Sequence, residues 1–261
     1  FVSVHFDFGA NAYQKTDMSN ALNEEEQKKI ENYNMQLAKN LTLARSLNMQ
    51  YSPAMFIMSE DGYAFSDEVY NEADEETVKN FSSVQNLRTL MNNYESDFDV
   101  IKELVSATKK GSAVERVNAI EDLYQTVDDK YVPTMKELFK SVPEIDKKNE
   151  SGKVSPLYCI YLFTELTNFT MINDFSSAVI LCRQAVNTGY LEGEELQQVY
   201  FLMSQMLIQI GSDDYAEILG CLTKSIDAAP ESQLSGELRI MLEQMTEIIN
   251  SQGGLEAPEG N

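Results

Sequence analysis

The most constraining feature of this sequence is a helical spacing of apolar residues that starts at Asp74 and continues to about Asn250. Glycine and proline interrupt it at Gly111, at Pro133, from Pro143 to Pro156, from Gly189 to Gly193, at Gly211 and at Pro230. Short turns of this kind join consecutive helices into antiparallel pairs. The sequence therefore predicts an all-α domain of antiparallel helix pairs over residues 86–250.

Residues 1–85 have a different pattern. An apolar run from Phe1 to Phe8, with Val and Phe at alternate positions, is typical of a buried or half-buried strand. Asn23 followed by three glutamates indicates the start of a helix that extends to Leu47, with a candidate break near Asn40. Two short apolar runs then flank Glu60-Asp61-Gly62, which predicts a β-hairpin over Ala54–Phe65.

Composition restricts the partners. The chain has 42 acidic and 20 basic residues and a net charge of −22, so it is repelled by phosphate backbones and by anionic membrane surfaces. No segment has the roughly 18 consecutive apolar residues that a membrane-spanning helix needs. We therefore expect a protein or peptide partner, no nucleic acid and no membrane span. Residues 251–261 have no apolar period and are interpreted as a disordered tail.

Few residues are candidates for chemistry. The three cysteines, Cys159, Cys182 and Cys221, lie in apolar helical patterns without a CxxC motif, and we interpret them as buried, inert thiols. A structural disulfide or a reactive thiol is the alternative. His5 is the only histidine, so a multi-histidine metal site is impossible. The sequence predicts no catalytic residue, no metal site and no cofactor in the chain.

The stretch from Leu43 to Gly62, in which Tyr51-Ser52-Pro53-Ala54 joins a helix to a strand, resembles the second half of a thioredoxin of the thiol:disulfide interchange group. The resemblance covers about Phe1–Phe81. It implies an α/β domain over residues 1–85 with a partial thioredoxin-like sheet, in which residues 2–8 and 54–58 lie near parallel. It also implies a cis Ser52–Pro53 bond, with Ser52, Pro53 and Ala54 binding a substrate strand.

The same resemblance implies that the first strand and first helix of the fold, with the catalytic CxxC, would precede Phe1. A sheet without its middle strand leaves buried backbone groups unpaired, at about 1–3 kcal/mol for each group. The sequence is therefore interpreted as a fragment, or as a fold that another segment completes. A gap or a foreign strand is expected between residues 2–8 and 54–58.

Residues Leu157–Met245 resemble tetratricopeptide-like repeats. Asn173–Val186 looks like the second helix of such a repeat, with Ala178 and Ala185 where helices must pack closely. Gly211–Pro230 repeats the theme about 40 residues later, but the usual period is 34 residues, and Ile218 stands where a small residue is normal.

Two functions follow as hypotheses. The first is a thioredoxin-like protein of the thiol:disulfide interchange group, a possible oxidoreductase relative that has a redox function only if a CxxC lies upstream of residue 1. The alternative is a non-catalytic protein-interaction module, in which the thioredoxin fold is a scaffold and the helices bind a partner. Because such fusions resemble exported bacterial proteins, we expect an extracytoplasmic location, in the periplasm or at the cell surface.

Overall fold

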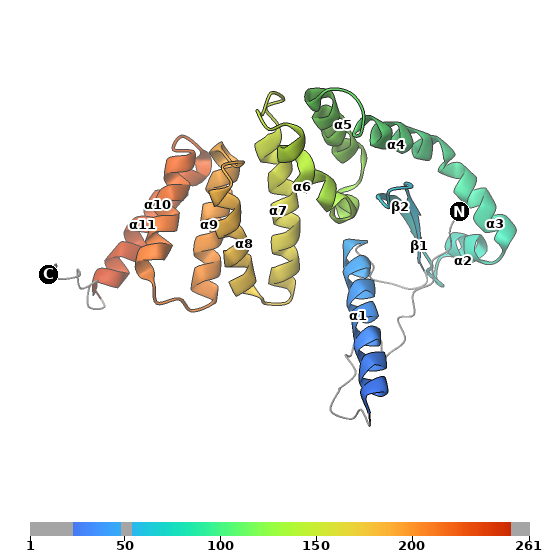
Figure 1. Ribbon diagram of the computed structural model, residues 1–261, viewed down its shortest axis with the longest axis horizontal. Helices are drawn as coiled ribbons and strands as arrows, with labels where there is room; N and C mark the ends of the chain where they lie inside the picture. Colours follow the sequence, from blue (N-terminus) through green and yellow to red (C-terminus); the bar gives the residue numbers. More distant parts are fainter. Residues whose placement is uncertain (1–22, 48–53, 252–261) are drawn as a thin grey trace. The chain divides into compact units, whose positions relative to one another are not determined.

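The computed structural model describes residues 23–47 and 54–251, which form two compact units (Figure 1). Unit 1 comprises residues 1–103 and 123–134, and unit 2 comprises residues 104–122 and 135–261. The chain therefore passes between the units three times. The boundary expected between residues 85 and 86 falls inside unit 1.

Most of the described residues are helical, and within them the strands form a single two-stranded sheet. Every described element after residue 86 is a helix, which confirms the all-α expectation for that part of the chain.

Unit 1 begins with α1 (Glu24–Ser46). Asn23 caps this helix, because its side-chain Oδ1 accepts a hydrogen bond of 2.9 Å from the backbone N–H of Glu26. The helix is continuous through Asn40, so the candidate break there is wrong. An asparagine inside a helix costs only a fraction of a kcal/mol, and a helix that has already formed extends past it.

The predicted hairpin is confirmed as β1 (Ala54–Met58) paired antiparallel with β2 (Ala64–Val69). Gly62 takes a φ of 83° in the turn, where the Ser59 N–H bonds the Tyr63 carbonyl at 2.9 Å. A bulge between Ile57 and Met58 shifts the register, and the second strand extends four residues past Phe65. The strand predicted over residues 2–8 lies outside the described residues, as does its relation to β1.

The helices of unit 1 follow the hairpin. Asp74 caps α2 (Glu75–Phe81), where helical structure was expected to begin, and Ser83 caps α3 (Val84–Asn93). The next elements are α4 (Glu95–Ala107), whose first nine residues belong to unit 1, and the 3-10 helix η2 (Asp129–Met135), which contains Pro133. Aromatic contacts tie them to β2 and its exit, with ring centroids 6.3 Å apart for Phe65–Phe98 and 5.8 Å apart for Tyr70–Phe81.

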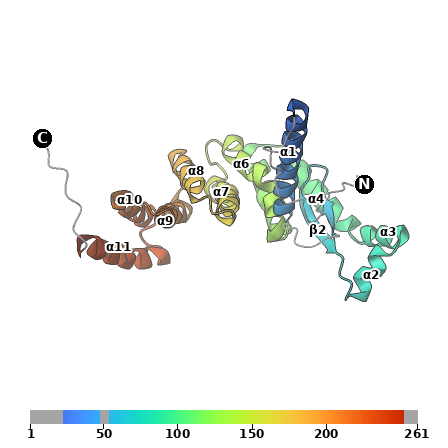
Figure 2. The same cartoon turned by 90° about the horizontal axis from the view of Figure 1, so that it is seen from below.

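Unit 2 contains the longer helices. They are α5 (Ala113–Thr126, entering unit 1 at residue 123), α6 (Lys136–Ile145), α7 (Val154–Met171), α8 (Phe175–Asn187), α9 (Gly193–Gln209), α10 (Tyr215–Ala228) and α11 (Gln233–Ser251). From α6 to α11 each helix packs on the next one in the chain, and α7 to α10 alternate in direction (Figure 1). Seen from below, α10 lies beside α11 (Figure 2).

The helix breaks agree with the expected positions, with two corrections, because Pro143 lies inside α6 and Pro156 lies in the first turn of α7. Pro143 is two residues before the last residue of α6, Ile145. The break comes at Asp146, where the chain turns before α7. Gly111, Gly189, Gly193 and Gly211 all have positive φ angles at the other breaks.

Small side chains lie in the core of unit 2 as expected, since Ala178 and Ala185 on α8 are fully buried. Ile218, at the departure from the repeat pattern, is buried as well. The largest buried side chains of the unit are apolar and include Ile120, Phe139, Met135, Leu162, Leu207, Leu222 and Leu238.

The largest buried polar side chain of unit 2 is that of Gln197 on α9, which is 1% exposed. Its amide nitrogen donates to the Ser235 hydroxyl at 2.7 Å and to the carbonyls of Ser225 and Ala229 at 3.2 and 3.3 Å. Its amide oxygen accepts a hydrogen bond of 2.6 Å from the Ser232 hydroxyl. The side chain therefore joins α9 to α10 and to the start of α11.

Candidate binding surface

The structure describes one of the three predicted substrate-binding residues. Ala54 is the first residue of β1, partly exposed and opposite Val69 in the ladder. Ser52 and Pro53 lie outside the described residues, and so does His5. The proposed cis bond and its substrate site therefore stay predictions.

The three cysteines are free and buried, as the sequence predicted. Burial, helped by the charge of Glu195, raises the pKa of Cys159 to about 12. Burial likewise raises the pKa of Cys182 to about 12 and that of Cys221 to about 11. A nucleophilic cysteine needs its thiolate form at neutral pH, and burial disfavours that form in all three side chains. Within the described residues no group of three or more His, Cys, Asp or Glu side chains is arranged to hold a metal ion.

A polar cluster on β2 was not predicted from the sequence. Asp67 accepts hydrogen bonds from the Tyr131 phenol and from the Lys130 ammonium, the latter at 2.7 Å. The neighbouring Glu68 accepts a hydrogen bond of 2.6 Å from the Tyr94 phenol. These contacts join the hairpin to η2 and to the residue between α3 and α4, all within unit 1.

The protonation of this cluster argues for a structural role. Burial, followed by the hydrogen bond to Asp67, raises the pKa of Tyr131 far above its ordinary value. Burial and the hydrogen bond to Glu68 also raise the pKa of Tyr94. Both phenols therefore remain protonated donors at physiological pH and cannot act as bases or nucleophiles. The cluster holds the hairpin in place.

In unit 2 the α7–α8 and α9–α10 turns are built in the same way. After α7, Asn173 takes a φ of 57°, and the N–H groups of Asn173 and Asp174 bond the carbonyls of Thr170 and Phe169 at 3.0 and 2.9 Å. After α9, Gly211 takes a φ of 68°, and the N–H groups of Gly211 and Ser212 bond the carbonyls of Ile208 and Leu207, both at 3.0 Å. Each pattern is a Schellman motif.

Each turn also ends in an aspartate that caps the next helix. The Asp174 carboxylate accepts from the Ser177 N–H at 3.0 Å, and the Asp214 carboxylate accepts from the Glu217 N–H at 2.9 Å. The two helix pairs, α7–α8 and α9–α10, are therefore two copies of one local design. Both turns lie at the same end of the helix array (Figure 1).

These turns expose large apolar side chains. We call this surface the loop edge, and its exposed apolar members are Met171 (63% exposed), Ile172 (52%), Ile208 (47%), Ile210 (43%) and Tyr215 (42%). The helix C-cap position is an isoleucine in both turns, Ile172 in the first and Ile210 in the second. The chain thus presents the same exposed side chain at equivalent positions of two helix pairs.

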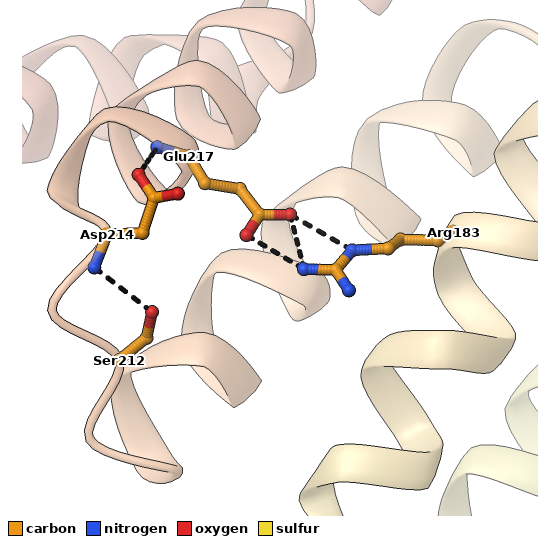
Figure 3. A network of polar contacts seen from close by, with 4 residues as sticks. All are labelled: Arg183, Ser212, Asp214 and Glu217. Atoms are coloured by element: carbon orange, nitrogen blue, oxygen red, sulfur yellow. Dashed lines mark hydrogen bonds and ion pairs between the residues drawn. The ribbon is translucent and has the colours of Figure 1, made fainter.

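The exposed charges at the loop edge are acidic. In and directly after the two turns the acidic residues are Asp174, Asp213, Asp214 and Glu217. The Arg183 guanidinium makes a bidentate ion pair across α8 and α10 with Glu217, at 2.7 and 2.8 Å (Figure 3). Its charge is therefore balanced by that carboxylate, while Asp213 and Asp214 remain exposed in the adjoining turn.

Comparisons with known proteins add one match. A family described as an uncharacterised protein C-terminal domain matches residues 161–251, from within α7 to the last residue of α11. This match covers well under half of the chain and includes both turns of the loop edge. Neither the curated proteins nor the solved structures gave a match. No helix among the described residues is long and apolar enough to cross a membrane.

Proposed function

We propose that this chain is a non-catalytic protein-interaction module whose binding part is the helix array of unit 2. The observation that carries the proposal is the repetition of one helix–turn–helix design in α7–α8 and α9–α10, including its exposed isoleucine. Stacked helix pairs form extended surfaces on which solenoid proteins bind their partners. Tetratricopeptide-like repeats are the class that we propose for this array.

The buried thiols support this proposal over a redox function of the described residues. Each cysteine has a raised pKa, and each is free within the folded unit. A binding surface needs no such chemistry, because exposed apolar groups and a rigid scaffold are enough.

The second candidate is a thioredoxin-like protein of the thiol:disulfide interchange group. The order of a long helix, an antiparallel hairpin through Asp61-Gly62 and a further helix in unit 1 supports a partial thioredoxin-like fold. A redox function would need a CxxC upstream of residue 1. In either case unit 2 would select the partner.

Site-specific photo-cross-linking tests the first proposal. A benzophenone amino acid would replace Gln205, an exposed residue of α9, and Lys29, an exposed residue of α1, in separate variants expressed in the native host. We expect the Gln205 variant to capture a discrete protein species that the Lys29 variant does not capture. Equal or absent capture at several exposed positions of unit 2 would contradict an interaction role.

An activity assay separates the two candidates. We expect the chain to reduce insulin no faster in the presence of dithiothreitol than a variant in which Cys159, Cys182 and Cys221 are all serine. Clear activity above that control would mean that one of these thiols is reactive, contrary to its burial.

A further inference from the structure

We propose that the loop edge docks a cationic protein segment that inserts apolar side chains between the two helix turns. This inference rests on the proposed interaction function and names the chemistry of the partner. The segment would place apolar residues on Ile172 and Ile210 and basic residues beside Asp213 and Asp214.

The turns themselves do not require these isoleucines. A Schellman motif is stabilised by its two backbone hydrogen bonds and often by an apolar contact of the residue after the positive-φ position. Here that residue is Asp174 in the first turn and Ser212 in the second, so both turns lack the usual apolar contact. The exposed C-cap isoleucines therefore add nothing that the turn geometry needs.

Single exposed apolar residues are ordinary on protein surfaces, but their clustering is informative. Of the exposed large apolar residues in unit 2, five lie in the two short segments 171–172 and 208–215. The repetition at equivalent positions gives a partner two similar anchor points on one rigid array. Anchors of this kind carry most of the binding energy in protein interfaces.

The charge around the edge selects a protein over a membrane. An exposed apolar edge could also insert into a lipid surface, but anionic lipids are repelled by the acidic residues here and by the net charge of −22. The Arg183 guanidinium is paired with Glu217, at the start of α10. The complementary surface is therefore apolar and positively charged, as in an amphipathic basic segment.

The probe for a first test is a fluorescent peptide of four Leu-Lys-Lys-Leu repeats, and its control carries Glu in place of every Lys. Binding to the full chain is measured by fluorescence anisotropy, and its location is measured by amide hydrogen exchange. We expect the Lys peptide to protect segments 171–174 and 208–215, and the Glu peptide to bind at least roughly tenfold more weakly.

Matched variants test the anchors. The double variant Ile172→Ser/Ile210→Ser should weaken peptide binding roughly tenfold. Ile240→Ser, on the surface of α11 where the side chain is 58% exposed, should leave it within about twofold. All three positions are exposed, so the melting temperature should stay within about 2 °C in each variant.

Each result decides the proposal. Equal weakening by Ile240→Ser, equal binding of the Glu peptide, or protection outside the loop edge would overturn it. So would sedimentation of the chain with phosphatidylcholine–phosphatidylglycerol vesicles, since a membrane would then be the partner. If cross-linking through Gln205 captures a partner while the isoleucine variants bind it normally, the interaction role stands and the loop edge is refuted.

Discussion

Replacing Gln197 by leucine should weaken the packing of α11 in unit 2. Leucine has a similar volume but no polar group. Four groups that now bond the glutamine side chain would therefore each lose that hydrogen bond. Those groups are the hydroxyls of Ser232 and Ser235 and the carbonyls of Ser225 and Ala229.

The magnitude follows from the two short hydrogen bonds. The contacts to Ser235 and from Ser232, at 2.7 and 2.6 Å, are each worth about 1 kcal/mol net, and the contacts to the two carbonyls are longer. The Ser235 hydroxyl keeps its bond of 2.7 Å to the Ala229 carbonyl, which limits the loss. We expect the free energy of unfolding of unit 2 to fall by about 2–3 kcal/mol, which lowers its melting temperature by about 5–10 °C.

Thermal and urea unfolding followed by far-UV circular dichroism measures this loss. The control is Gln198→Leu, the same change at the next, exposed position of α9, which should stay within about 0.5 kcal/mol. A double-mutant cycle with Ser235→Ala should give a coupling of about 1 kcal/mol. A Gln197→Leu variant as stable as the control, or a coupling near zero, would refute the reasoning that this side chain fixes α11.

Three other predictions concern pH, thiol access and the division of the chain. Burial raises the pKa of Asp146, but N–H donors of Ser151 and Glu150 at 2.8 and 2.9 Å outweigh it and hold the pKa below its ordinary 3.8. The carboxylate therefore contributes stability that is present above pH 3.8 and is lost as the pH falls through its lower pKa in the folded chain. Asp146→Asn removes this contribution, so the urea midpoint of the variant should fall less between pH 7 and pH 3. The cysteines should react with iodoacetamide at pH 8 about 10²–10³-fold more slowly in the folded chain than in urea, because a pKa of 11 to 12 leaves little thiolate; equal rates would contradict their burial. Residues 86–261 contain all of unit 2 and should melt cooperatively when expressed alone, whereas residues 1–85 should not; circular dichroism of the two pieces checks this.

Local signals in the sequence were sufficient for much of the secondary structure. Asp61-Gly62 placed the hairpin turn, and Asn23 and Asp74 placed helix starts, because each residue type acts through contacts within a few positions. The second strand was predicted too short. Its last residues, Ser66 to Val69, include two acids, and the partner that pairs with Asp67 is Tyr131, 64 residues away in the chain.

The exposure of the loop edge and the position of the unit boundary also depend on contacts between residues far apart in the sequence. Isoleucine and methionine in a helical pattern are normally core residues, and only the structure shows that Met171, Ile172 and Ile210 are exposed. A signal was nevertheless present in the sequence. In Ile172-Asn173-Asp174 and in Ile210-Gly211-Ser212-Asp213, an isoleucine precedes an asparagine or glycine, and an aspartate follows. The boundary near residue 103 was hidden because residues 123–134 return to unit 1 after a helix that begins in unit 2.

The two helix pairs differ in their cores more than in their turns. With Phe175 aligned to Tyr215 at the starts of α8 and α10, Ala178 aligns with Ile218 and Ala185 aligns with Ser225, and all four are buried. An isoleucine needs more room between helices than an alanine. Ser225, in place of the second alanine, donates its hydroxyl hydrogen to the backbone carbonyl of Gln197 on α9 at 2.7 Å. Helix spacing therefore cannot repeat exactly from one pair to the next. The turn geometry is set by backbone hydrogen bonds and not by core volume, so it repeats more closely. The loop edge is where both pairs present an isoleucine at the same position, and this is the reason that we propose it as the docking surface.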